Sequence, residues 1–145
     1  MASSFSADIG KWAAQTEQRM TAVFRQSAQK VAEEVKKPVG AGGHMRVKTG
    51  YLRASLMAST SQMPSINPMG QPADDAADNS YAEDANVTLT IAGAGIGQTI
   101  YLGFTANYAR PREYQDGFVR LTAQRWPQIV EECARLIKSR VEARG

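Results

Sequence analysis

The chain has 145 residues, a mass of 15.7 kDa and a formal net charge of +3. That length suits one domain, and hydrophobic residues make up 43% of it, enough for a core without disulfides. No apolar run approaches the ~20 residues of a membrane-spanning helix, and the first ten residues lack the pattern of a signal peptide. A single cysteine, Cys133, and a single histidine, His44, leave little for a disulfide or a zinc site. We therefore expect residues 1–145 to form one domain that works inside a cell, with no cofactor and no membrane partner.

Charge is distributed unevenly along the chain. Residues 1–48 carry eight basic and four acidic side chains, residues 49–109 carry one and five, and residues 110–145 carry eight and five. Two basic flanks around an acidic middle favour head-to-tail contact between copies of the chain, because opposite potentials steer association. The alternative is that these charges only solvate the surface.

Residues 6–37 have the period of one long amphipathic helix. Apolar side chains such as Val31 and Val35 recur three and four residues apart, and Pro38 with Gly40 ends the pattern. At ~1.5 Å per residue this helix is about 48 Å long, whereas a compact domain of this size is about 38 Å across. The helix must bend or project, and a projecting apolar stripe predicts that another subunit covers it.

The middle of the chain has the composition of loops and short strands. Residues 38–48 are rich in glycine and residues 63–86 are rich in proline and acidic side chains, so we expect two flexible loops. Three segments alternate in hydrophobicity, which predicts strands at 55–62, 87–91 and 99–104.

The last third of the chain contains a glycine-rich turn and a second long helix. Residues 93–98 are expected to join two of the strands as a hairpin loop, and residues 105–116 to be irregular. A second amphipathic helix is predicted from about Gly117, with Pro127 kinking or interrupting it. Cys133 lies on its apolar side and should be buried. The predicted fold class is α+β: a long N-terminal helix, a small antiparallel β-sheet and a long C-terminal helix.

No group of residues has the spacing of a catalytic centre. A strand, rather than the helix that a phosphate-binding loop needs, is expected after the glycines of 93–98. His44 has no acidic neighbour to orient it and should be exposed. Asp74, Asp75 and Asp78 lack the glycine and the terminal glutamate of a calcium loop, and we expect them to solubilise their own loop. We therefore expect no enzyme activity.

Residues 108–114, with the sequence YARPREY, combine aromatic and basic side chains. They fit a loop packed by two tyrosines, and alternatively a surface that stacks on bases and contacts phosphates. The second interpretation makes the chain a small basic nucleic-acid-binding accessory protein, whose affinity for DNA would fall steeply with salt. Its contacts would come from Arg110, Arg112, Arg120 and Arg125.

Two motifs resemble one family. Residues 49–56, TGYLRASL, resemble the TG-x-LR-x-S-I/L signature of small neck and tail-completion proteins of long-tailed bacteriophages, of the lambdoid tail-component type. In that family a long helix precedes the signature, and short strands, an aromatic Y-A…E-Y/F segment and a C-terminal helix follow it. Tyr108-Ala109 and Glu113-Tyr114 resemble the aromatic segment.

The resemblance implies a structural protein of the virion. Such proteins form rings, usually sixfold, at the head–tail junction, and DNA passes through them only as cargo. The implied partners are further copies of the chain, expected as a hexamer, and adjacent head-completion and tail-terminator or tail-tube proteins, assembled in the bacterial cytoplasm. The loops 38–48 and 63–86 are expected to become ordered only on assembly. The residues expected at subunit or partner contacts are Arg53, Asp74, Asp75, Asp78, Arg110, Arg112, Glu113 and Tyr114.

Arg53 is the only cation between Thr49 and Ala109. We expect it to pair with a carboxylate of its own chain or of a neighbouring one. The alternative is a surface ion pair that contributes at most about 1 kcal/mol.

Overall fold

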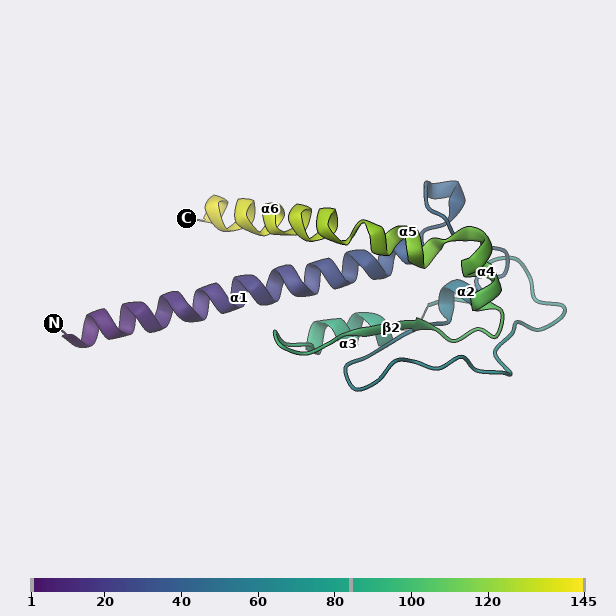
Figure 1. The fold of residues 1–145 in the computed structure, drawn as a ribbon, viewed down its shortest axis with the longest axis horizontal. Helices are drawn as coiled ribbons and strands as arrows, with labels where there is room; N and C mark the ends of the chain where they lie inside the picture. The colour runs from purple at the N-terminus through teal and green to yellow at the C-terminus, as the bar shows by residue number, and fades with distance from the viewer. Residues whose placement is uncertain (1, 84, 145) are drawn as a thin grey trace.

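The computed structural model describes residues 2–83 and 85–144, and it is an α+β fold, as expected. Two long helical segments lie side by side and antiparallel, with both termini at the same end (Figure 1). The first is α1 (Ala2–Val35), and the returning segment consists of α5 (Phe118–Gln124) and α6 (Trp126–Arg144). We call α1 together with α6 the arm. All other elements gather near the end of α1 that lies away from the termini (Figure 1).

The long helix α1 begins at Ala2 rather than at residue 6, and it ends at Val35. Its 34 residues make a rod of about 51 Å. Among the α1 positions whose burial is described, the buried ones, including Ala28 and Ala32, lie in the C-terminal third of the helix, and α1 contacts both α3 and α5. Of the two expected possibilities, bending or projecting, the helix projects beyond the elements gathered near its C-terminal end (Figure 1).

A two-stranded antiparallel sheet pairs β1 (Leu56–Ser59) with β2 (Tyr101–Phe104). Leu56 lies opposite Phe104, and Ser59 lies opposite Tyr101. Both strands fall within segments predicted to be strands. The core lies between this sheet, α3 and the C-terminal part of α1. It includes Phe104 and Phe118, whose rings pack edge-to-face.

The strand expected at 87–91 is wrong, because this segment belongs to the helix α3 (Asn86–Gly93). Val87 and Ile91, four residues apart, are buried on one face, whereas Leu89 is 68% exposed. β-branched composition expresses only a weak preference, and packing against β1 and α1 overrides it here. The hairpin expected at 93–98 is also wrong, because these residues follow a helix and lead into β2.

Residues 109–116, expected to be irregular, form the helix α4 (Ala109–Asp116). Pro111 is tolerated because it lies in the first turn, where its missing N–H has no helical partner to lose. Gly117, with a φ of 70°, ends α4 and begins α5. The interruption expected near Pro127 is confirmed, because the chain leaves α5 at Arg125 and α6 begins at Trp126.

The two segments expected to be loops differ in how they are held. Residues 38–48 contain a 3-10 turn, η1 (Val39–Ala41), and a bridge from Pro38 to Met45, whose side chain is fully buried. The short helix α2 (Tyr51–Ala54) follows. In the second loop, residues 63–83 and 85 hold no helix or strand, and residue 84 lies outside the described part of the chain. Ordering of either loop on assembly stays a prediction.

Candidate assembly surfaces

Residues 49–56 fold into a tight turn that leads into the sheet. Gly50 has a φ of 85°, and a Cβ atom there would lie 2.7 Å from the carbonyl oxygen of Tyr81. Thr49 Oγ1 accepts a hydrogen bond from the Tyr51 amide at 3.2 Å, although the N-cap of α2 is Gly50, which has no side chain to cap the helix. Ser55 Oγ donates to the Leu52 carbonyl at 2.7 Å, and the Leu52 side chain is buried. The motif thus builds the turn and leaves few of its side chains for a partner.

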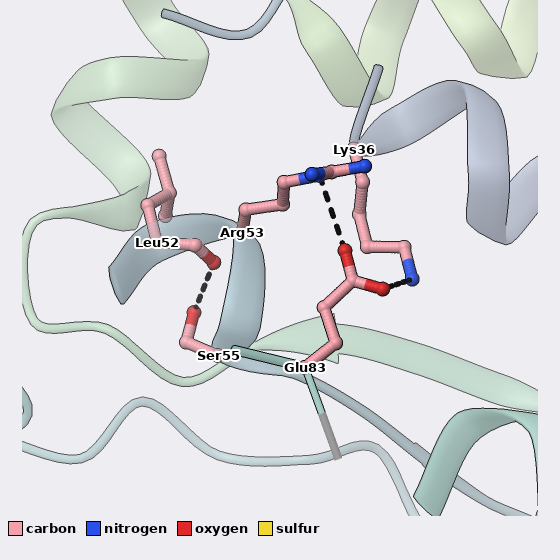
Figure 2. Close-up of polar contacts among 5 residues, drawn as sticks. All are labelled: Lys36, Leu52, Arg53, Ser55 and Glu83. Carbon is pink, nitrogen blue, oxygen red and sulfur yellow. Dashed lines mark hydrogen bonds and ion pairs between the residues drawn. The ribbon is translucent and has the colours of Figure 1, made fainter. Parts of the chain in front are cut away.

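Glu83 joins three segments of the chain (Figure 2). Its Oε2 lies 3.0 Å from Lys36 Nζ, just past the end of α1, and its Oε1 lies 3.1 Å from Arg53 Nε, on α2. The Arg53 contact is an ion pair without the alignment of a hydrogen bond. The carboxylate that pairs with Arg53 therefore comes from its own chain. Because the Arg53 and Glu83 side chains are 42% and 38% exposed, the contact is also the surface ion pair given as the alternative. The Lys36 side chain is only 10% exposed, so Glu83 neutralises a largely buried ammonium group.

Replacing Glu83 with glutamine is expected to lower the free energy of unfolding by about 1–2 kcal/mol. Lys36 would keep its charge in a largely buried position without a counter-charge, although the partly exposed Glu83 moderates the loss. Urea denaturation measures this difference. Glu33→Gln, at an exposed position of α1, is the matched control and should change stability by less than about 0.5 kcal/mol. Equal losses of unfolding free energy in the two variants would contradict the role of Glu83 as the counter-charge of Lys36.

Three tyrosine rings pack together, and one of them, Tyr51, belongs to the TGYLRASL turn. The Tyr51 ring meets Tyr81 edge-on at 5.0 Å and lies 6.4 Å from Tyr108. Burial raises the pKa of Tyr108 above 10.0, against the opposing effects of a backbone hydrogen bond with Leu52 and the charge of Arg112. Tyr108 therefore serves as a packing anchor. The expectation of a loop packed by two tyrosines is wrong in its other parts, because the segment forms α4 and Tyr114 is 86% exposed.

The raised pKa of Tyr108 predicts a loss of stability in alkali. Below pH 10 the phenol is neutral in both the folded and the unfolded chain, so its contribution is constant. As the pH rises past 10 the unfolded chain ionises first, so the free energy of unfolding falls until the folded pKa is passed. Comparing urea midpoints of wild type and Tyr108→Phe between pH 8 and 11 tests this. The phenylalanine variant should show a shallower alkaline decline, and identical slopes would contradict the prediction.

The expected contact residues of α4 have different roles. Glu113 caps α5, because its two carboxylate oxygens accept hydrogen bonds from the Val119 amide at 2.8 Å and the Arg120 amide at 3.0 Å. Arg112 lies close enough to Tyr108 to influence its pKa. Arg110 is exposed and the Tyr114 side chain is 86% exposed, so these two remain available to a partner.

The three aspartates of the second loop are exposed, as expected. Asp74, Asp75 and Asp78 form no ion pair with any residue that the structure describes, and neither does Arg110 or Arg112. Within one chain, the acidic loop and the α4 arginines are therefore not brought together.

An open apolar groove of about 580 Å³ runs between β2, α4 and α5. We call it the α4–α5 groove. Arg110 and Arg120 lie among its lining residues and are exposed. Its apolar lining includes Leu102, Phe104, Tyr114, Phe118, Val119 and Ala123.

A second groove, of about 590 Å³, follows the arm between α1 and α6. Part of the apolar stripe predicted on α1 is covered here by α6, and part stays open to solvent. Its lining includes Met20, Val23, Phe24, Trp126, Val130 and Ile137.

The isolated chain has an unusually large surface for its mass. Its accessible area is 9565 Å², whereas a compact monomer of 15.7 kDa exposes roughly 7,300 Å². The excess of about 2,300 Å² reflects the projecting arm and the open grooves.

Sequence reasoning missed Glu83 and both grooves. Arg53 as a lone cation in an acidic segment did signal a nearby carboxylate, but it could not select Glu83 among five acidic residues. The grooves form between elements far apart in the chain, and the segment that forms α4 was not expected to be a helix. No sequence signal marked the α4–α5 groove. The lining of the groove between α1 and α6 belongs to the apolar stripes predicted on the two long helices, but the sequence did not show that a groove stays open between them.

The described residues offer little for other chemistry. They contain no cluster of histidine, cysteine and acidic side chains arranged to hold a metal, and no helix among them is long and apolar enough to cross a membrane. His44 is exposed and Cys133 is buried, as expected. No family model, curated protein or solved structure matches the chain.

Proposed function

We propose that the protein is a structural subunit of a tailed-bacteriophage virion, forming a ring at the head–tail junction that joins the tail to the head and lets DNA pass. The observation that carries this proposal is the excess of about 2,300 Å² of exposed surface on the isolated chain. Specific stable interfaces bury about 1,200–2,000 Å² in total, and obligate ones about 2,000–5,000 Å². A chain with this much exposed surface is suited to burying part of it against other subunits.

The order of elements supports the same proposal. A long helix, the TGYLRASL turn, two short strands, the segment from Tyr108 to Tyr114 and a C-terminal helix follow one another as in the family that the sequence resembles. The motif residues stabilise the turn within one chain. We therefore assign the contacts between subunits to the exposed groups of α4, of the acidic segment 69–78 and of the arm. In this role the protein has no catalytic activity, binds copies of itself as a hexamer, and contacts head-completion and tail-terminator or tail-tube proteins.

The alternative, a DNA-binding accessory protein, has less support. Of its four expected arginines, Arg125 pairs with Glu34 and lies 3.7 Å from Glu132, and Arg112 lies beside Tyr108. Only Arg110 and Arg120 remain exposed without an ion pair to another described residue. Titration with duplex DNA at low and moderate salt distinguishes the two, because a binder would show tight, strongly salt-dependent affinity.

Gold labelling of purified virions tests the proposal. A peptide tag added after residue 145 leaves the described elements unchanged, and an anti-tag gold conjugate reports its position in electron micrographs. We expect gold at the junction of head and tail. Infectious virions that contain none of the protein would contradict the proposal.

A further inference from the structure

We infer that the α4–α5 groove binds the acidic loop, residues 69–78, of a second copy of the chain. This inference deepens the proposed function, because it names the two surfaces through which neighbouring subunits would meet. It needs only that the chain self-associates, and it does not depend on where in the virion the protein lies.

The groove offers an apolar floor with positive charge on its rim. Arg110 and Arg120 are both exposed, and neither forms an ion pair within the described part of the chain. Glu113 is the only acidic residue along the groove, and both its oxygens accept hydrogen bonds from α5 amides. A ligand that carries apolar and anionic groups therefore fits this surface.

The acidic loop offers the matching groups. Met69 is 84% exposed, and Asp74, Asp75 and Asp78 follow it within nine residues without an ion pair in the chain as described. A methionine adapts readily to an irregular apolar floor, and the carboxylates complement the two guanidinium groups of the rim.

Three backbone groups in or next to the loop form hydrogen bonds with other segments of the chain or with residues on the loop's own C-terminal side. The Ala73 amide donates to the Tyr81 hydroxyl at 3.0 Å, and the Asn79 amide donates to the Lys48 carbonyl at 2.8 Å. The Asn107 amide donates to the Gly70 carbonyl at 2.7 Å.

The occupant must come from another molecule. The same hydrogen bonds fix both ends of the acidic loop to its own chain, and its carboxylates form no ion pair with the described arginines there. Contact between two different patches of identical chains is heterologous, so each copy offers a groove to one neighbour and a loop to the other. Such a contact closes into a ring where the rotation from one copy to the next divides a full turn, and the proposed function requires that geometry.

Cysteine cross-linking tests the contact directly. Met69→Cys and Ala123→Cys, at exposed positions in the loop and the groove, are purified separately, mixed and oxidised. We expect a disulfide-linked dimer in the mixture that contains one chain of each kind. Wild type, which keeps the buried Cys133, is the control for background oxidation. No mixed dimer under conditions where wild type self-associates would overturn the inference.

Charge reversal tests its electrostatics. Arg110→Glu with Arg120→Glu is expected to weaken self-association about 100-fold, and so is Asp74→Lys with Asp75→Lys and Asp78→Lys, because like charges then face each other. A chain carrying both the arginine and the aspartate substitutions should self-associate with an affinity within about tenfold of wild type, because opposite charges face each other again with their signs exchanged. Lys30→Glu with Lys37→Glu, exposed and outside the groove, is the matched control and should associate as wild type does.

Analytical ultracentrifugation measures these affinities, and circular dichroism verifies that each variant is folded. Wild type that stays monomeric at its highest soluble concentration, or reversal variants that associate normally, would overturn the inference. Gold at the head–tail junction together with normal association of the reversal variants would defeat the inference alone. The expected association pattern in a protein absent from virions would defeat the proposed function alone.

Discussion

Replacing Gly50 with alanine is expected to lower the free energy of unfolding by about 2–4 kcal/mol. Two costs add here. A φ of 85° is in the left-handed region, which costs a residue with a Cβ atom roughly 1–2 kcal/mol. The new Cβ atom would also lie 2.7 Å from the Tyr81 carbonyl oxygen, so backbone must shift to relieve the overlap.

Gly97 provides the matched control for this prediction. Its φ is 91°, but no heavy atom of another segment lies within 4 Å of a Cβ atom built there. Gly97→Ala should therefore show only the conformational cost, about 1–2 kcal/mol. Urea denaturation of both variants measures the difference. If Gly97→Ala lowers the free energy of unfolding as much as Gly50→Ala does, the close approach of the Tyr81 carbonyl is not the reason that position 50 requires glycine.

Replacing Phe118 with alanine is expected to cost about 3–5 kcal/mol of stability. The side chain is 1% exposed, and its ring meets Phe104 edge-to-face at a centroid distance of 5.2 Å. Truncation removes this contact and leaves a cavity between α5 and the sheet. Because Phe118 also forms part of the groove floor, the variant should self-associate more weakly even where it remains folded.

Val119→Ala is the control for the change at Phe118. Val119 is adjacent in α5 and also lines the groove, but it is 41% exposed. Its truncation should lower stability by less than about 1 kcal/mol. Thermal and urea denaturation measure the loss of stability in the two variants. A small loss for Phe118→Ala would show that the sheet and α5 do not share one core.

The sequence predicts the parts of the fold that have strong local signals. The long helices follow from apolar residues repeated over many turns, and the break before α6 follows from Pro127. The paired strands lie within segments of alternating hydrophobicity. Each of these signals is contained within the element it specifies.

The wrong predictions concern segments whose structure depends on their neighbours. VTLTI at 87–91 alternates like a strand, yet Val87 and Ile91 also lie one helical turn apart. Only the presence of β1 and α1 decides that the helical face is the buried one. In α4 the sequence is polar, and Glu113 bonding to the start of α5 fixes where the helix turns into the next one.

The candidate surfaces were predicted in part. Exposure of Arg110 and the aspartates follows from their residue types, whereas the exposure of Tyr114 does not, and Arg53 and Glu113 proved to have internal partners. Glu83 lies 30 positions beyond Arg53, and pairing over that distance requires the fold. The α4–α5 groove joins residues from both halves of the chain, and no local pattern specifies it.

The most direct test of the proposed role is electron microscopy of phage particles made without this gene. We expect DNA-filled heads and separate, complete tails, because the subunit that joins them is missing. Adding purified wild-type protein should restore joined, infectious particles. Normal infectious particles in its absence would contradict the account.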